Sequence, residues 1–240
     1  MTDYILHLAD DAIILGHRNS EWTGHGPILE QDIALSNISL DLIGQARHFY
    51  QYAAEQIGNG TTEDTLAYQR GAEEYKNCLL VEQPNGHWGT TIMRQFLFSA
   101  YQYPLFMELQ RLGNESISAI AEKSLKEIIY HLRWSSEWVI RLGRGTDESH
   151  EKMKEAVSAL WKYTDDMLTP ALYDPFIERS DEIANQWKEK VTNIFHQASL
   201  TVPDGVEMIT GGKESRHTRH LVDLLAEMQC LQRTYPGVQW

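Results

Sequence analysis

Hydrophobic residues recur along almost the whole chain at the three- and four-residue spacing of α-helices. No stretch shows the convincing alternation of a half-buried β-strand. The longest such pattern covers residues 28–57, where apolar side chains fall on nearly every side of the expected helix. A helix that is apolar all round belongs inside a larger assembly of helices. The pattern therefore predicts an all-α protein with the 28–57 helix in its interior.

The other helices are predicted from the same spacing and from the residues at their ends. They cover residues 4–18, 62–74, 88–112, 116–142, 148–168, 181–199 and 217–235, with a short helix between 75 and 82. The expected N-terminal caps are Thr61 or Thr62, Asn114 or Ser116, Asp147, and Ser180. Pro104 predicts a kink or local unwinding of the 88–112 helix, since proline cannot donate the helical hydrogen bond.

Long helices joined by short connections are typical of a helical bundle. Residues 201–216, with one proline and three glycines, are predicted to be a loop. We find no internal repeat, low-complexity tract or flexible linker. The sequence therefore predicts a single domain over residues 1–240.

Composition narrows the classes of partner. The chain has 240 residues, and 42% of them are hydrophobic. Its net charge is −13, and it has no basic stripe, so the charge argues against binding to nucleic acid. The same negative charge permits binding to a more basic protein. No apolar run approaches the roughly 18–20 residues of a membrane span, and the acidic N-terminus lacks the basic region of a secretory signal. We expect a cytoplasmic protein with no membrane partner and two cysteines that form no disulfide framework.

Asp41 lies at the middle of the apolar 28–57 helix, on the same side as Asn37, Gly44 and His48. A buried carboxylate must be paired, hydrogen-bonded or bound to a metal, because burying it bare is costly. Two interpretations stay open from the residues alone. The helix either lines a metal-carboxylate bundle, or derives from one that has lost its metal.

A carboxylate-bridged di-iron bundle uses glutamates from two helices and a Glu-x-x-His pair from each of two others. Glu127 and His131 lie four residues apart on one helix face, which favours an ion pair or hydrogen bond. Glu214 and His217 have the three-residue spacing, but they stand at the very start of the last helix. Neither pair matches the required pattern within a helix.

His217 and His220 share one face of the last helix, where we expect them to meet Asp41 or Glu127 in a polar core or to donate to loop carbonyls. Together, Asp41, Glu127, His131, His217 and His220 outline a di-metal core without its full ligand set. Iron oxidation chemistry needs several anionic oxygens and open coordination positions, which these residues do not obviously offer. The sequence predicts no catalytic residue and no metal ligand.

Six stretches, spread over nearly the whole chain, form a specific combination of motifs. They are residues 26–47 (with Gly26-Pro27, Asn37, Asp41 and Gly44-Gln45), 79–86, 130–133, 210–213, 217–221 and 225–233, followed by Gln239-Trp240. Together they resemble the C subunits of bacterial phenylacetyl-CoA epoxidases, which belong to the ferritin-like superfamily. Glu214 departs from the pattern of that family.

The resemblance implies a ferritin-like helical bundle with additional helices. It also implies membership of a multicomponent oxygenase that converts phenylacetyl-CoA to its ring 1,2-epoxide with O2 and electrons from NADPH. In this family the A subunit holds the di-iron centre and binds the CoA thioester, and a reductase with FAD and an iron–sulfur cluster delivers electrons. The C subunit has lost its metal, so the resemblance implies no cofactor in this chain.

Two functional hypotheses follow. In the first, the chain is a non-catalytic structural subunit that supports the catalytic A subunit among further subunits of the complex. In the second, it is a di-metal oxygenase or oxidase active in its own right. A helical binding module and a homodimer of the isolated chain are further alternatives. Partner contacts are expected on aromatic-rich faces, either of the 88–112 helix or around Trp134 and Trp138.

Overall fold

The computed structural model describes residues 1–235 and residue 238. These residues form α-helices, short 3-10 helices and loops, without any β-strand. The all-α class is therefore as predicted from the hydrophobic spacing. The Gln239-Trp240 motif lies outside the described residues.

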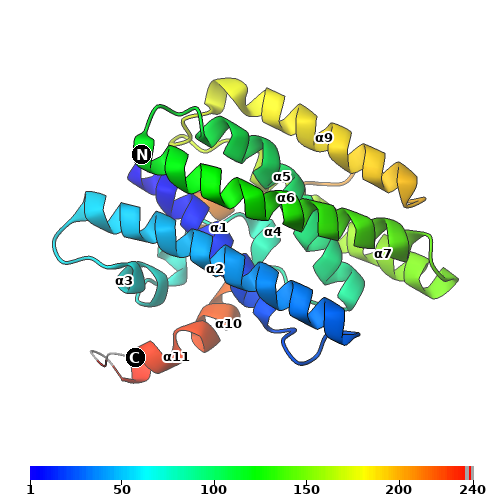
Figure 1. The fold of residues 1–240 in the computed structure, drawn as a ribbon, viewed down its shortest axis with the longest axis horizontal. Coiled ribbons are helices and arrows are strands. Elements are labelled where there is room, and N and C mark those ends of the chain that lie inside the picture. Colours follow the sequence, from blue (N-terminus) through cyan, green and yellow to red (C-terminus); the bar gives the residue numbers. More distant parts are fainter. Residues whose placement is uncertain (236–237, 239–240) are drawn as a thin grey trace.

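Two pairs of long antiparallel helices form the centre of the molecule. The first pair is α1 (Thr2–Ser20) with α2 (Leu29–Ile57), and the second is α5 (Trp88–Leu109) with α6 (Glu115–Gly143). The pairs meet where α2 contacts α6, and Figure 1 shows these two helices at the front with α1 and α5 behind them. This arrangement is that of a ferritin-like helical bundle, which confirms the predicted fold class.

Shorter helices surround the bundle. They are α3 (Glu63–Tyr68), α4 (Leu79–Glu82), α7 (Asp147–Leu160), α8 (Thr164–Leu168), α9 (Ser180–Gln197), α10 (Arg219–Met228) and α11 (Cys230–Thr234), with 3-10 turns at Ala72–Glu74, Trp161–Tyr163, Ile177–Arg179 and Gly212–Glu214. Helices α7 and α9 pack on α5 and α6, whereas α4 and α10 lie near one end of α1 (Figure 1). None of the helices in the described part of the chain could span a membrane.

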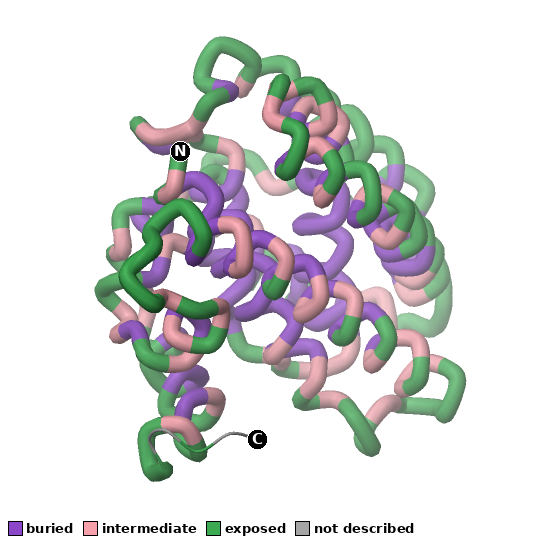
Figure 2. The backbone as a smooth tube through the Cα atoms, turned by 60° about the vertical axis from the view of Figure 1, so that its left-hand side comes forward, coloured by how far each residue is buried: buried purple, intermediate pink, exposed green. Residues whose placement is uncertain are grey.

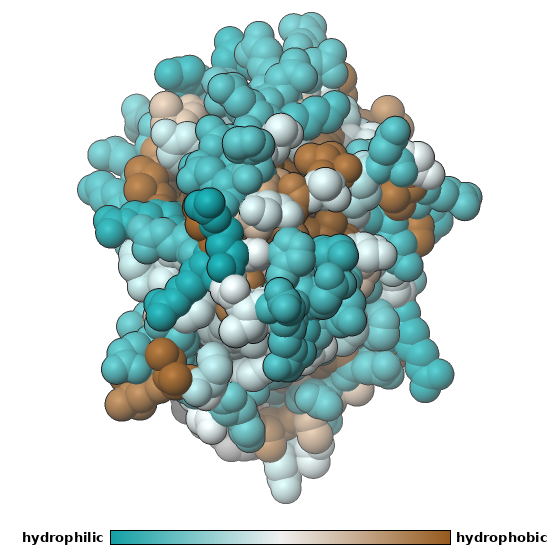
Figure 3. Space-filling view, turned by 90° about the vertical axis from the view of Figure 1, so that its right-hand side faces the viewer, coloured by the Kyte–Doolittle hydropathy of each residue, from teal (hydrophilic) through white to brown (hydrophobic). Residues whose placement is uncertain are grey.

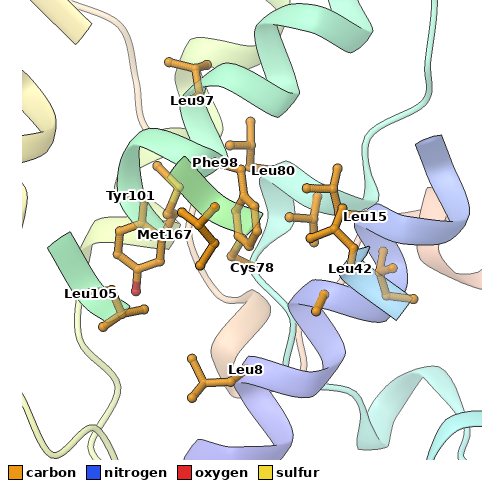
Figure 4. Packing of buried hydrophobic residues seen from close by; sticks show 14 of the residues in the cluster. Leu8, Leu15, Leu42, Cys78, Leu80, Leu97, Phe98, Tyr101, Leu105 and Met167 are labelled. Carbon is orange, nitrogen blue, oxygen red and sulfur yellow. The ribbon is translucent and has the colours of Figure 1, made fainter. Parts of the chain in front are cut away.

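Helix α5, rather than α2, is the most buried of the long helices. Of its 22 residues, 18 are buried, and Figure 2 shows buried backbone gathered at the middle of the molecule. Figure 4 shows side chains from α1, α4, α5 and α8 packed together in that core. Most of the predicted aromatic face of α5 is therefore covered, although Tyr103 is 37% exposed; Trp134 is also buried, and Trp138 is half-buried.

The prediction that the 28–57 helix is enclosed on every side was wrong. One half of α2 packs on α1 through residues such as Leu35 and Phe49, but Ile33 is 51% exposed and Leu40 is 66% exposed. The contacts of α2 with α1, α3 and α6, and with Phe106 of α5 through Phe49, leave this outer half uncovered. Apolar residues of α2 therefore have two environments: those that face α1 are buried, and those on the outer side are exposed.

Several helix ends follow the local sequence. Thr62 caps α3, Asn114 caps α6, and Gly58 ends α2 with a φ of 71°. Asp147 and Ser180 do not act as caps. Thr146 caps α7, and the Ser180 hydroxyl instead donates to the Ile177 carbonyl.

Three predicted helices are broken in the structure, within 62–74, 148–168 and 217–235. Two of the breaks carry side chains with distant buried partners. Arg70 pairs with Asp10 of α1, and the buried Gln229 side chain donates to the Arg70 carbonyl at 3.0 Å. Helix α5 continues through Pro104 instead of unwinding there.

Candidate functional site

A row of polar side chains joins α2 to α6 along the line where the two helices meet. Because residues three or four apart share a helix face, successive members of the row lie one turn apart on each helix. We call these three hydrogen-bonded pairs the polar seam: Asp41–His131 at 3.0 Å, Gln45–Glu127 at 3.0 Å and His48–Lys123 at 2.8 Å.

Asp41, Glu127 and His131 converge at the centre of this seam. The His131 side chain is fully buried, whereas that of Asp41 is 35% exposed. Burial raises the pKa of Glu127, and the neighbouring Asp41 carboxylate raises it further, against the lowering effect of the hydrogen bond that Gln45 donates. Two carboxyl groups and one imidazole thus influence each other across the α2–α6 contact.

The outer pair of the seam is cationic. Lys123 donates to Nε2 of His48, so the imidazole must be neutral there to accept the hydrogen bond. Partial burial and the nearby cations of Lys123 and Arg47 lower the pKa of His48, in agreement with that assignment. This end of the seam therefore carries positive charge with no carboxylate in the pair.

The residues of the seam do not fit a di-metal centre. Among residues 1–235 and 238, no group of three or more His, Cys, Asp or Glu side chains is placed to hold a metal ion. The Asp41 carboxylate is hydrogen-bonded to His131, and Glu127 to Gln45. The buried polar side chains of α5 include neither a carboxylate nor a histidine, although a di-iron bundle draws acidic ligands from its facing helices.

His217 and His220 lie away from Asp41 and Glu127, so the first of the two predicted environments was wrong, whereas His217 does meet a loop carbonyl, the second alternative. His217 is 2.8 Å from a Glu82 oxygen through Nδ1 and 2.9 Å from the Tyr75 carbonyl through Nε2. The His220 side chain is exposed. Helix α10 begins at Arg219 and contacts α4 and the 72–74 turn, which places it away from the polar seam.

The surroundings of His217 define its protonation. Burial alone lowers its pKa, but the hydrogen bond and the charge of Glu82 outweigh burial and raise the pKa above the ordinary value. Both ring nitrogens face acceptors, which is the arrangement that an imidazolium satisfies. His217 and Glu82 therefore form a buried ion pair, and the Glu214–His217 spacing is not a metal pair.

Sequence reasoning missed a second group of buried carboxylates, which we call the loop anchor: Asp10, Asp11, Glu82 and Asp166. These carboxylates accept hydrogen bonds from backbone N–H groups of two irregular segments, 76–79 and 211–218. The donors are Lys76 to Asp10, Cys78 to Asp11, Leu79, Gly211 and Gly212 to Asp166, and Thr218 to Glu82.

The loop anchor explains why acidic residues occur in apolar stretches. Asp10 and Asp11 stand inside the apolar first helix, and Glu82 directly follows an apolar run. Buried backbone donors outside regular structure need acceptors, and carboxylates supply strong ones. These acidic residues in apolar stretches were the available signal, but the sequence did not show which loops they would meet.

The fold and the seam define the class of this protein: an all-α, ferritin-like bundle whose central polar residues are hydrogen-bonded to each other and do not form a di-metal ligand set. Comparisons identify the family within that class. Residues 1–240 match the family model described as phenylacetic acid catabolic protein. The C subunit of the 1,2-phenylacetyl-CoA epoxidase of Escherichia coli (strain K12) is 44% identical over 248 aligned positions, covering 100% of this chain and 99% of that protein. The chain belongs to the phenylacetic acid catabolic protein family.

Proposed function

We propose that the chain is the C subunit of a 1,2-phenylacetyl-CoA epoxidase and serves that complex as a non-catalytic structural subunit. The observation that carries this proposal is the 44% identity, from end to end, with a protein that bears that name. The donor set of the polar seam supports the non-catalytic part, because Asp41, Glu127 and His131 do not form a di-metal ligand group.

The proposed partner is a catalytic A subunit that holds the di-iron centre, with further subunits and a reductase carrying FAD and an iron–sulfur cluster. These assignments rest on the resemblance of the sequence motifs to the epoxidase family. We propose that residues 1–240 act as one cytoplasmic domain without a cofactor of its own. Four former ligand candidates would then have structural roles, Asp41, Glu127 and His131 in the seam and His217 beside Glu82, whereas the exposed His220 side chain would have none.

One observation favours the second hypothesis, an oxygenase active in its own right. Asp41, Glu127 and His131 do come together, on two adjacent helices. No group of three or more His, Cys, Asp or Glu side chains among the described residues is placed to hold a metal ion, which makes this function the less favoured one.

The test is to express the chain alone and together with the other epoxidase subunits of its own source, and to measure iron and turnover in each preparation. We expect far less than one iron per chain and no epoxidation by the isolated chain, with activity only in the complex. Stoichiometric iron in the isolated chain that disappears in Asp41→Ala and Glu127→Ala would support the second hypothesis. The exposed substitution Glu115→Ala on the same helix as Glu127 is the matched control.

A further inference from the structure

The uncovered side of α2 carries two large apolar residues seven positions apart, which places them on the same side of the helix. Ile33 and Leu40 are 51% and 66% exposed, and Asn37, Gly44 and Arg47 lie on the same side at helical spacing. Single exposed apolar residues are normal on a protein surface, but aligned ones that join a second helix indicate a contact site. The neighbouring helix α6 provides such a continuation.

On α6, Ile129 and Tyr130 are 49% and 46% exposed. The Tyr130 ring lies against the ring of His131, with centroids 6.2 Å apart, and His131 bonds Asp41, the residue next to Leu40. The exposed apolar residues of the two helices are therefore at the same level along the bundle. We call Ile33, Leu40, Gly44, Ile129 and Tyr130 the α2–α6 face, and Figure 1 is viewed towards α2 and α6.

The α2–α6 face continues into a groove between α5, α6 and α9. This groove has a volume of ≈ 510 Å³, and Ile129 forms part of its wall together with Tyr103 and Pro104. Figure 3, which shows the right-hand end of the molecule, is mostly hydrophilic with scattered hydrophobic patches. The groove thus gives the face a concave border where a protruding side chain of a partner can be buried.

Gly44 is the second observation that points to a partner. Glycine in a helix interior is unfavourable and usually has a steric reason. A Cβ built at Gly44 meets no atom of this chain within 4 Å, so nothing inside the protein requires glycine there. The bare backbone between Leu40 and Arg47 instead allows another helix to approach closely.

The charges around the face indicate the chemistry of that partner. Lys126 on α6 and Lys190 on α9 form no ion pair within the described residues, and Lys123 donates to the neutral His48. These three lysines therefore form a group of cations beside the face in a chain whose net charge is −13. They fit a surface that offers apolar side chains bordered by carboxylates. A second copy of this chain would also bring a net charge of −13, which opposes self-association.

We propose that a helix of the neighbouring epoxidase subunit docks on the α2–α6 face. The apolar side of that helix packs across Gly44, and its carboxylates lie against Lys123 and Lys126. This inference rests on the proposed function, because that function supplies the partner. The occupant buries Leu40 and Tyr130 and covers the exposed edge of Asp41.

The test measures the dissociation constant between this chain and the other epoxidase subunits of the same source. The face variants are Leu40→Glu, Gly44→Leu and Lys126→Glu. The control is Leu172→Glu, because Leu172 is 100% exposed in a loop remote from the face, and Val222→Glu on α10 is a second control. Circular dichroism and thermal unfolding of each isolated variant establish that it is folded.

We expect each face variant to weaken binding at least tenfold and each control to change it by less than twofold. Lys126→Glu should also reduce the salt dependence of binding, because it removes an interfacial cation. Unchanged binding by the folded face variants would overturn the inference while leaving the proposed function intact. A wild-type chain that binds none of the subunits contradicts the proposed function itself. Self-association of the wild type that Gly44→Leu abolishes, with subunit binding unchanged, would make a second copy the occupant and overturn the proposal.

Discussion

At the scale of single residues, buried charges in this protein mostly hold the chain in place. The Asp10 carboxylate illustrates this role, because it receives the Arg70 guanidinium, the Tyr50 hydroxyl and the backbone N–H of Lys76. Breaking such a pair by removing one member leaves an uncompensated buried charge, which costs more than the pair itself contributes. Mutations here should therefore act on stability before they act on any partner.

The Glu82–His217 pair gives a prediction of this kind. His217→Gln should lower the free energy of unfolding by about 3 kcal/mol, because Glu82 is then left buried without its cation. The loss should depend on pH. The folded-state pKa of His217 is raised above 6.5, so its stabilising contribution is complete below that pH and is lost as the pH rises through the folded-state pKa. Urea unfolding at about pH 6 and about pH 9 measures the difference between variant and wild type.

The matched control for that prediction is His220→Gln, three residues away and exposed. Its free energy of unfolding should stay within about 0.5 kcal/mol of the wild type at both pH values. A deficit of the His217→Gln variant that grew with rising pH would contradict the assignment of an imidazolium bound to Glu82.

At the scale of elements, two glycines allow the effect of helix propensity on stability to be distinguished from the effect of tertiary packing. One of them has open space beside it, and the other is tightly enclosed. Gly44→Ala should raise the free energy of unfolding of the isolated chain by about 1 kcal/mol, since the new methyl group meets nothing and alanine favours the helix. Gly212→Ala should destabilise the chain, because a Cβ there lies 2.4 Å from the Asn77 carbonyl oxygen and 2.8 Å from an Asp166 oxygen. Thermal or urea unfolding of both variants checks the two signs.

An equal loss of stability in both glycine variants would contradict the view that Gly44 has no steric role within the chain. The Gly44→Ala variant also separates stability from binding. If the α2–α6 face docks a helix, the small alanine side chain stabilises the isolated subunit while Gly44→Leu weakens the complex.

Element boundaries show what local sequence can predict. The caps at Thr62 and Asn114 and the stop at Gly58 were predicted, because each depends on hydrogen bonds or backbone angles within a few residues. The breaks near Arg70 and Gln229 were not predicted. Both depend on partners 60 or more residues distant in sequence, which no local pattern contains.

At the scale of the whole molecule, burial decreases from the centre of the bundle to the C-terminal helices. Of the 22 residues of α5, 18 are buried, whereas α11 has no buried residue. Local opening free energies follow this contrast, because segments with few buried contacts open without unfolding the core. The chain therefore has a rigid four-helix centre and a less protected edge.

Amide hydrogen exchange followed by mass spectrometry tests this gradient. Peptides from α11 should exchange at least tenfold faster than peptides from α5, with α10 between them. Exchange should become uniform only under conditions that unfold the whole chain. Equal protection of α11 and α5 in the isolated protein would show that the C-terminal helices belong to the same cooperative unit as the bundle.

The candidate site was predicted in part. The structure brings Asp41, Glu127 and His131 together on two long helices whose periodicity fixes which side chains share a face. The predicted bond between Glu127 and His131 was wrong, because His131 bonds Asp41 and Glu127 accepts from Gln45, both across to α2. The sequence could not decide between the two environments predicted for His217, because its position depends on where an irregular segment returns to the bundle. That return is set by hydrogen bonds to Glu82 and Asp166, which only the tertiary structure brings together.

The sequence by itself determined the all-α class, the positions of the long helices and the family, because periodicity, caps and motifs each depend on residues that are close together in the sequence. Only the tertiary structure decided that α5 is the buried centre, that one side of α2 faces outward, and that His217 pairs with Glu82. The physical reason is that burial and side-chain pairing depend on which distant segments pack together. The hydrophobicity of a helix alone does not determine which of its sides another segment of the chain will cover.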